Sequence, residues 1–448
     1  MKKFFKNYKR DLIFLVIIIL VSVFFRVIGL DKIPTNISGD EVTNLSDVYK
    51  IIFGKGISFY SFMGDGSVAG INFYWSSLFI NFFGLEKTIF ALRFSIATLS
   101  ILSLIPFYLL LREEVTPRVS FIFTILLSAN FVFLNFSRTA WINMGIVFTG
   151  LFLILFLEKA LKENHLKWFL LSGFFAGLTL YGYHYGRIMV LSLFLYLFLL
   201  FLKKEKRKII YFKGVFLTIF VAFLVFLPFL INIFKDHGEA ILRRPIAAYA
   251  FPQNINIFQH QVEYTLKGFI LLDGSVVSEG IENMRYLPFH NPPVNIFIKI
   301  LFLAGLVYFV LFERKFTIWL VVLVSILLTQ IASSLPPNFS RGIFYLPFVY
   351  FISAIFFYKI WTYSRCCFPK NPKIIYLFAL FFTGLLFFYD TNRYFQWMGT
   401  EEIYTARQPA IDYKEFPVWQ DFQIKRVKLG RLPVTNYEWY EIRKSFGH

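Results

Sequence analysis

The sequence predicts an all-α polytopic membrane protein with about eleven transmembrane helices. Of its 448 residues, 57% are hydrophobic and only 16% are charged, and the mean hydropathy is +0.61. A chain of this composition has too few polar residues to cover the surface of a soluble globular protein. Its repeated long apolar runs suit helices, which satisfy their own backbone polar groups in lipid.

Eleven apolar runs approach the roughly 20 residues that a membrane-spanning helix requires. They lie near residues 12–28, 90–111, 119–136, 143–160, 167–183, 188–202, 209–233, 294–312, 316–334, 342–361 and 374–390. A shorter apolar and aromatic stretch, residues 68–84, precedes the second run. We expect this stretch to re-enter the membrane or to lie on its surface. No small-residue cleavage site follows the first run, so we expect an uncleaved span.

The positions of the basic residues predict how the helices are oriented. If residues 68–84 do not cross, the Lys and Arg residues within 2–10, 112–118, 159–167, 203–208, 314–315 and 359–373 all fall on one side. The positive-inside rule makes that side cytoplasmic, which also explains the formal charge of +19 without a nucleic-acid partner. We therefore expect a cell-membrane protein with a cytoplasmic N-terminus and with its active site and C-terminus outside the cytoplasm.

This topology predicts the division of the chain into domains. Residues 1–390 would form one transmembrane domain with two long outer loops, 29–89 and 235–293. Residues 391–448 would form a short extracytoplasmic tail, which we expect to pack on loop 235–293 because so short a segment is marginal as a free domain. The histidines of that loop are too widely spaced for a metal motif, so no metal ligands are predicted.

The first outer loop carries two adjacent carboxylates, Asp40 and Glu41, at the membrane edge. Ser38 and Glu41 have the spacing of a capping box, which predicts that a helix begins near Gly39. An apolar face then recurs at helical spacing, at Val42, Leu45, Tyr49 and Ile52. The loop thus predicts an amphipathic helix on the outer face. A lone acidic pair at a helix start most often only caps the helix, but the spans that follow contain few other acids.

Three outer turns each carry an arginine, namely Arg138, Arg187 and Arg341. A single interfacial arginine usually anchors at lipid headgroups. Three of them on the face that carries the carboxylates indicate one substrate site. The turn of Arg187 adds Tyr181, His184 and Tyr185 as candidate substrate-binding residues, although His184 is equally well explained as an interfacial histidine.

This set of side chains suits a substrate that has a phosphate, a lipid tail and a sugar. Arginine matches phosphate oxygens through its planar fork, and aromatic rings stack on sugars and line grooves for isoprenoid chains. A carboxylate within hydrogen-bond reach can take the proton of an attacking hydroxyl. Because fixed cations stabilise a departing phosphate, one base and a few arginines are a minimal set for glycosyl transfer from a lipid-linked phosphosugar.

Several short motifs carry a family resemblance. They are Arg26 to Glu41 with Gly29-Leu30 and Pro34, Phe83-Gly84 before Ala91-Leu92-Arg93, Ser137-Arg138, the spaced Gly177, Tyr181, Tyr185 and Arg187, and Arg341 before Leu346-Pro347. Over about residues 10–350, their order resembles the GT-C glycosyltransferases. Within these, it is similar to bacterial family 39 and aminoarabinose-transferase-like proteins, a group that includes the protein O-mannosyltransferases.

The resemblance implies an inverting hexosyl- or pentosyltransferase that uses a polyprenyl-phosphate sugar and acts outside the cytoplasm. Asp40 matches the catalytic base of the family, and Glu41 matches the adjacent acid that orients substrate or loop. Arg138, Arg187 and Arg341 match basic residues near the lipid phosphate. Many relatives carry an acid shortly after the position of Arg138, where this chain has Asn143. This departure weakens the case for a metal there, and the need for a divalent metal is left open.

Two other classes of function compete with this interpretation. A non-enzymatic flippase or transporter of lipid-linked sugars would place charged residues near the middle of the membrane, whereas here the polar residues gather at one face. A structural scaffold would use the outer loop and tail to bind a partner. The sugar, the acceptor (protein, glycan or lipid) and the oligomeric state do not follow from the sequence.

Overall fold

The structure, a computed structural model of the chain, confirms the predicted all-α class. It describes residues 8–54, 62–63, 68–202, 208–235, 255–277, 287, 291–312, 317–331, 337–367, 372–400, 410–431, 434, 438–439 and 441–442. Each of the apolar runs contains at least one helix. The corresponding helices are α2 (Tyr8–Val27), α5 (Thr88–Glu114), α6 (Pro117–Ala129) with α7 (Phe131–Arg138), α8 (Met144–Glu163), α9 (Leu166–Leu180), α10 (His184–Leu202), α11 (Lys208–Lys235), α16 (Ile296–Phe312), α17 (Thr317–Ile331), α18 (Tyr345–Cys367) and α19 (Pro372–Met398).

The helices identify a multi-pass membrane protein. Among the described residues, four helices are long and apolar enough to cross a bilayer: Leu85–Glu114, Met144–Glu163, Phe212–Asn232 and Tyr345–Ser364. A fifth span results if α6 and α7 are counted together, although they meet at a bend of 59°. Several other apolar helices, such as α9 and α16, are shorter. The predicted count of eleven spans is therefore not confirmed.

The bend corrects one prediction, because residues 119–136 were expected to form a single helix. Asn130 interrupts it with extended backbone angles, φ −50° and ψ 130°. The Asn130 side chain accepts a hydrogen bond from the Phe133 backbone N–H (3.0 Å) and so caps the start of α7. Its amide also donates to the Pro293 carbonyl (2.8 Å). An asparagine that satisfies backbone groups locally competes with helical hydrogen bonding, which explains the break.

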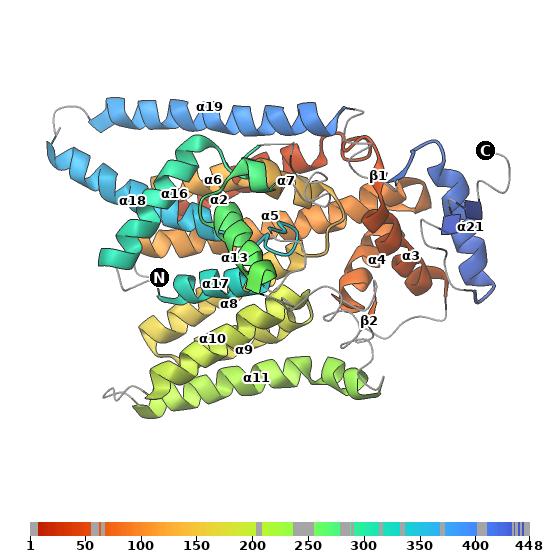
Figure 1. The fold of residues 1–448 in the computed structure, drawn as a ribbon, viewed down its shortest axis with the longest axis horizontal. Helices are drawn as coiled ribbons and strands as arrows, with labels where there is room; N and C mark the ends of the chain where they lie inside the picture. Colours follow the sequence, from red (N-terminus) through yellow and green to blue (C-terminus); the bar gives the residue numbers. More distant parts are fainter. Residues whose placement is uncertain are drawn as a thin grey trace.

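Two short helices lie at one end of the bundle, where they run across the direction of the long helices (Figure 1). They are α3 (Gly39–Phe53) and α4 (Ile71–Phe83). Helix α4 covers most of the stretch expected not to cross, and its 13 residues are too few to span a bilayer. It packs against α5 and α3, and the Trp75 indole N–H donates to the Ser95 carbonyl of α5 (2.8 Å). This arrangement agrees with a surface-lying or re-entrant segment.

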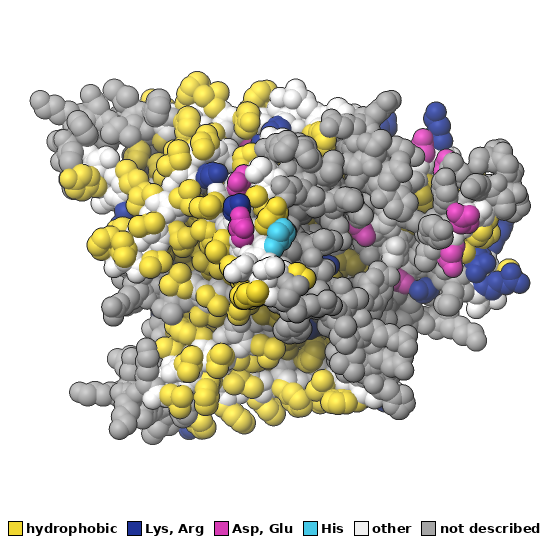
Figure 2. Space-filling model, in the orientation of Figure 1, with side chains coloured by type: hydrophobic (Ala, Val, Ile, Leu, Met, Phe, Trp, Pro, Cys, Tyr) yellow, Lys and Arg dark blue, Asp and Glu magenta, His cyan; other side chains and the backbone are white. Residues whose placement is uncertain are grey.

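The surface of the bundle is apolar. Figure 2 shows hydrophobic side chains over most of the long helices, whereas charged side chains gather mainly over the end that carries α21 (Phe416–Lys428) and over α13 (Ile255–Phe269). Phe216 of α11 and Phe381 of α19 are 62% and 66% exposed. Such a surface is unfavourable in water and favourable in lipid.

Loop 235–293 contains α13 and α14 (Gly274–Val277) among its described residues.

Buried ion pairs mark the two ends of α5: Arg93 with Glu41 toward its N-terminal end, and Arg112 with Asp11 toward its C-terminal end. Near its C-terminal end, the Arg112 Nε donates to Asp11 of α2 at 2.7 Å, and the neighbouring Glu114 pairs with Lys162 of α8 at 2.7 Å. These contacts bring three of the predicted cytoplasmic connections to the same end. Arg93 lies 19 residues earlier on α5 (112 − 93), or about 28 Å along the helix. That distance is close to the thickness of a bilayer core.

The C-terminal tail packs against the first outer loop, a contact that the sequence did not predict. Its strand β4 (Ala410–Ile411) pairs antiparallel with β1 (Ile37–Ser38), and α21 packs on α3. The fully buried Trp419 of α21 lies 6.1 Å from Tyr49 of α3, measured between ring centroids. A second short ladder joins β2 (Phe62–Met63) to β3 (Val68–Ala69). These contacts of the described tail are made to the first outer loop. Much of loop 235–293 lies outside the described residues, so the expected packing of the tail on that loop stays a prediction, as does the domain boundary at residue 390.

Candidate active site

The start of α3 has the predicted capping box. The Glu41 backbone N–H donates to the Ser38 hydroxyl (3.4 Å), and the Ser38 backbone N–H donates to Glu41 Oε2 (2.9 Å). Helix α3 therefore begins at Gly39 as predicted, with Asp40 and Glu41 in its first turn. On the apolar face Val42, Leu45 and Tyr49 are buried. Burial raises the pKa of the Tyr49 hydroxyl above its usual value, so Tyr49 stays neutral and serves as core.

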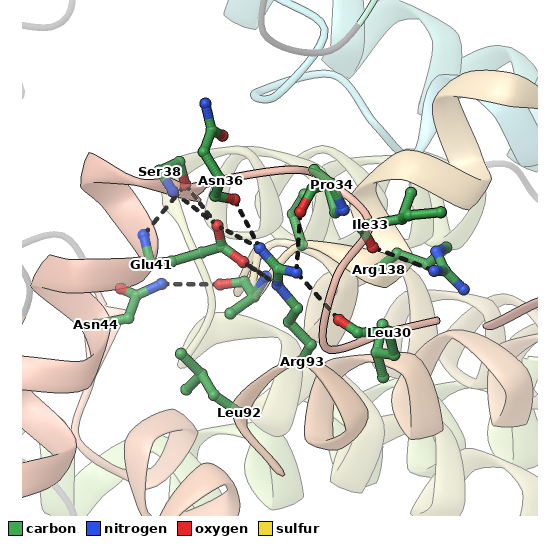
Figure 3. A network of polar contacts seen from close by, with 12 residues as sticks. Leu30, Ile33, Pro34, Asn36, Ser38, Glu41, Asn44, Leu92, Arg93 and Arg138 are labelled. Atoms are coloured by element: carbon green, nitrogen blue, oxygen red, sulfur yellow. Dashed lines mark hydrogen bonds and ion pairs between the residues drawn. The ribbon is translucent and has the colours of Figure 1, made fainter. Parts of the chain in front are cut away.

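The Glu41 carboxylate has a second partner, which the sequence did not assign. Arg93 of α5 donates from Nε to Glu41 Oε1 (2.7 Å) and from Nη2 to Oε2 (3.3 Å). Both side chains are buried, with 0% and 2% of their areas exposed. Figure 3 shows the two charged groups facing each other beneath the first outer loop. A buried bidentate pair of this kind orients both groups strongly, so Glu41 is held in one position.

Arg93 also binds the backbone of the outer loop. Nη1 donates to the Leu30 carbonyl (3.0 Å) and to the Tyr413 hydroxyl (2.8 Å), and Nη2 donates to the Asn36 carbonyl (2.9 Å). Together with the bonds to Glu41, these contacts use all five guanidinium N–H groups. The Arg93 side chain therefore joins α5, the outer loop, α3 and the C-terminal tail at one point.

A second buried arginine, Arg138, holds the other side of the same loop (Figure 3). Its Nη1 donates to the Phe25 carbonyl at the end of α2 (2.7 Å), and its Nη2 donates to Ile28 (2.8 Å) and Ile33 (3.1 Å). The rings of Tyr394 and Phe395 lie 5.6 and 5.0 Å from its Cζ. Arg138 is completely buried, and both of its Nη groups donate to carbonyls. A direct contact between Arg138 and a donor phosphate stays a prediction.

The two acids of α3 are in different surroundings. Glu41 accepts hydrogen bonds from Ser38 and Arg93 and also from the Ala140 backbone N–H (3.4 Å), so its oxygens have little remaining capacity. Asp40 precedes it by one residue and is only half-buried. Successive residues on a helix point about 100° apart, so Asp40 and Glu41 project in different directions from α3. Asp40 is therefore the acid that a substrate can reach more easily.

The remaining predicted residues lie on the same end of the bundle in varied environments. Arg187 is half-buried beside Phe229 (5.8 Å from Cζ to the ring centroid), and its Nε donates to the Leu180 carbonyl (3.3 Å). Arg341 is also half-buried, in the turn before α18. Tyr185 is buried against Phe344. His184 begins α10, but its side chain lies outside the described residues.

A cavity of about 320 Å³ adjoins the Glu41 network, between α4, α5, α8 and α9. Its lining is mainly apolar, with Asn72 and Thr149 as polar members, and it includes the predicted residue Tyr181. Ile96 of its wall lies one turn of α5 beyond Arg93. Ile142 of its wall lies two residues beyond Ala140, whose backbone binds both Glu41 and Asn44. The cavity wall thus includes residues close in sequence to two groups that bind Glu41.

Two members of the site were not singled out as functional by sequence reasoning. Arg93 was noted only as part of a family motif. The feature that could have indicated a function is a single arginine at the start of an apolar run. Tyr413 carried no signal in the sequence, because its contact with Arg93 joins residues 320 positions apart.

Across the described part of the chain, no cluster of three or more His, Cys, Asp or Glu side chains could hold a metal. Asn143, where relatives carry an acid, donates to the Ser340 carbonyl (2.7 Å).

Comparisons with known proteins agree with this description. Residues 71–232 match the family model described as dolichyl-phosphate-mannose-protein mannosyltransferase. No curated protein matches the sequence. The fold is similar to ArnT from Cupriavidus metallidurans bound to undecaprenyl phosphate, with a TM-score of 0.53 and 11% identity over 76% of this chain and 59% of that chain.

A second similar structure is the Archaeoglobus fulgidus oligosaccharyltransferase in complex with Zn and sulfate. The TM-score is 0.50 and the identity 15%, over 94% of this chain and 57% of that chain. The chain therefore spans less than two thirds of the length of either protein. Both are GT-C glycosyltransferases, which is the superfamily that the sequence resembles. The chain is thus a multi-pass membrane protein with the GT-C glycosyltransferase fold.

Proposed function

We propose that the protein is an integral-membrane glycosyltransferase. It moves a sugar from a polyprenyl-phosphate donor to an acceptor hydroxyl outside the cytoplasm, with inversion, and Asp40 is the general base. The observation that carries this proposal is the contrast between the two acids of α3. Glu41 is buried and bound by Arg93 and Ser38, whereas the adjacent Asp40 is half-buried at the helix start, where it can receive a proton.

The proposed reaction needs one base and a stabilised leaving group. The acceptor oxygen forms a bond to the anomeric carbon of the sugar as the bond from that carbon to the phosphate oxygen breaks. The acceptor proton passes to Asp40, and the electron pair leaves with the polyprenyl phosphate. Attack opposite the leaving group inverts the anomeric centre. No general acid is required, because cations such as Arg187 or Arg341 can stabilise the phosphate that departs.

The apolar cavity beside the network supports a lipid-linked donor. Its 320 Å³ would accept one or two isoprenoid units or a sugar ring, and it is lined by aromatic and aliphatic side chains. The similar ArnT structure contains undecaprenyl phosphate, which supports the same donor class here. No comparison supports the alternative of a non-enzymatic flippase.

A transfer assay tests the function directly. Purified protein in nanodiscs is supplied with undecaprenyl phosphate that carries radiolabelled mannose, glucose or aminoarabinose, together with a cell-envelope fraction as acceptor. We expect label to move to the acceptor and undecaprenyl phosphate to appear in equal amount from one of the donors. A parallel reaction with EDTA tests the need for a divalent metal. Movement of intact donor across a vesicle membrane without transfer would instead identify the flippase.

The three predicted arginines are expected to contribute unequally. Arg138 binds three carbonyls, one at the end of α2 and two in the loop that follows, so Arg138→Ala should lower the thermal stability of the protein as well as its activity. Half-buried Arg187 and Arg341 are the candidates for phosphate contact. Replacing the contacting one with Lys keeps the charge but loses the bidentate fork, so the KM for the donor should rise by about tenfold at unchanged melting temperature. Normal turnover in Arg187→Ala and Arg341→Ala alike would contradict a phosphate role for either.

The proposed orientation makes a separate prediction. Cys366 and Cys367 are the last two residues of α18, within the basic region at 359–373 that we place in the cytoplasm. A membrane-impermeant maleimide should label them only after the cells are permeabilised. A single cysteine introduced at Lys414 of the tail, in a variant without the two native cysteines, should be labelled in intact cells. The reverse pattern would contradict the orientation and place the Asp40 site in the cytoplasm.

A further inference from the structure

We propose that the C-terminal tail supports the active site and that Tyr413 is a positioning residue that acts through Arg93. This inference rests on the function proposed above, and it gives the tail a role that the sequence did not assign. The Tyr413 hydroxyl accepts a hydrogen bond from Arg93 Nη1 (2.8 Å) and donates one to the Pro34 carbonyl (2.8 Å). One phenol therefore connects the guanidinium that holds Glu41 to the backbone of the first outer loop.

Contacts on both sides of Tyr413 bind the tail to the same region. Before it, β4 pairs with β1 in the register Ile37 to Ile411 and Ser38 to Ala410. Because β1 ends two residues before Asp40, the ladder fixes the backbone that leads directly into the start of α3. After it, the Gln420 amide donates to the Leu85 carbonyl and the Thr88 hydroxyl, both at 3.1 Å, at the beginning of α5.

The outer loop needs such support because its own structure is sparse. Between α2 and α3 the described backbone forms turns and the two-residue strand β1. Its partners come from elsewhere: Arg93, Arg138 and the tail. The Thr35 backbone N–H also donates to the Met398 carbonyl (3.1 Å), and its hydroxyl donates to Thr400 (3.1 Å). A base that must lie within hydrogen-bond reach of the acceptor loses efficiency steeply when it is misplaced.

Tyr413→Phe is the test, because it removes the hydroxyl and keeps the ring. Arg93 Nη1 keeps its bond to Leu30, so the variant should fold. We expect kcat to fall by about tenfold, since a misplaced base loses much of its contribution. The KM for the undecaprenyl-phosphate sugar should stay within about twofold, because the role proposed for Tyr413 is to position the loop and not to bind the donor. Tyr389→Phe, which removes a hydroxyl from an exposed tyrosine of α19, is the matched control and should behave as wild type.

A double variant tests whether Tyr413 acts through Arg93. Arg93→Lys keeps a cation, but one ammonium cannot hold Glu41, the loop carbonyls and Tyr413 together. In this background Tyr413→Phe should cause little further loss of kcat, because groups that act as one unit are not additive. Losses that multiply would overturn the proposed route through Arg93.

Hydrogen exchange separates this inference from the function on which it rests. In Tyr413→Phe the backbone amides of residues 35–41 should exchange about threefold to tenfold faster than in wild type, as expected for the loss of one or two hydrogen bonds. Unchanged exchange together with unchanged kcat would refute the positioning role while the transferase stands. Faster exchange in a protein that transfers none of the labelled sugars would instead confirm that Tyr413 holds the loop and refute the proposed function.

Discussion

Asp40→Asn is expected to remove almost all transferase activity and to leave the fold intact. Asparagine is nearly the same size as aspartate and is itself favourable at the start of a helix, and the capping box of α3 uses Ser38 and Glu41 instead. An amide cannot accept a proton at neutral pH. A general base typically contributes about 10²–10⁴-fold to the rate, so kcat should fall by about that factor. Radiolabel transfer and thermal unfolding in nanodiscs measure the two quantities.

The matched control for this prediction is Asp31→Asn, which neutralises an exposed acid of the same outer loop. This variant should keep wild-type kcat and melting temperature. If Asp40→Asn also turned over at nearly the wild-type rate, Asp40 would be a helix-capping residue only and the protein would lack a proposed base. A large loss of melting temperature in Asp40→Asn would likewise contradict the assignment, because the lost activity would then reflect unfolding.

Breaking the Glu41–Arg93 pair is expected to have the largest effect on stability. Either charge left alone in the buried site would lack compensation, and removal of one partner of a buried ion pair typically costs about 3–5 kcal/mol. We therefore expect Arg93→Met to lower the free energy of unfolding by about that amount. Glu41→Gln neutralises the other partner and leaves the Arg93 charge uncompensated in the buried site. Its bidentate bond to Arg93 predicts a loss comparable to that of Arg93→Met.

The double variant Glu41→Gln with Arg93→Met should be less destabilised than the sum of the single variants, because it leaves no unpaired buried charge. Lys425→Met is the control, since it breaks an ion pair with Asp421 (2.6 Å) in which both side chains are exposed. Exposed pairs contribute little, so its unfolding midpoint should not change. Chemical unfolding in mixed micelles measures all four variants. Equal losses in Arg93→Met and Lys425→Met would contradict the structural importance of the buried pair.

The position of the helices could be read from the chain because it depends on local pattern. Apolar runs of sufficient length predicted each long helix, and the capping-box spacing of Ser38 and Glu41 predicted the start of α3. The apolar pattern did not predict the break at Asn130, because the sequence is apolar on both sides of the 59° bend between α6 and α7. The cause of that bend is partly non-local, because the Asn130 amide binds the Pro293 carbonyl, 163 residues away.

The partners of the site residues could not be predicted in the same way. The sequence assigned Arg138 to a donor phosphate, and the structure places its guanidinium on carbonyls at the end of α2 and in the loop that follows. It assigned Glu41 to the capping box and to an orienting role, but it did not predict the hydrogen bond from Arg93, which lies 52 residues away in the sequence. In each case the identity of an arginine shows that it needs acceptors, and only packing decides which acceptors it meets.

The sequence by itself determined that this protein lies in a membrane, which stretches of the chain contain its long helices, and which loop carries the candidate base. These properties follow from hydrophobicity and from contacts three or four residues apart, which any chain segment carries with it. Only the tertiary structure decided that Glu41 is buried and bound while Asp40 is reachable, and that the tail closes on the first outer loop. These outcomes depend on which helices pack together, and contacts such as that of Tyr413 with Arg93, 320 residues apart, leave no local pattern in the chain.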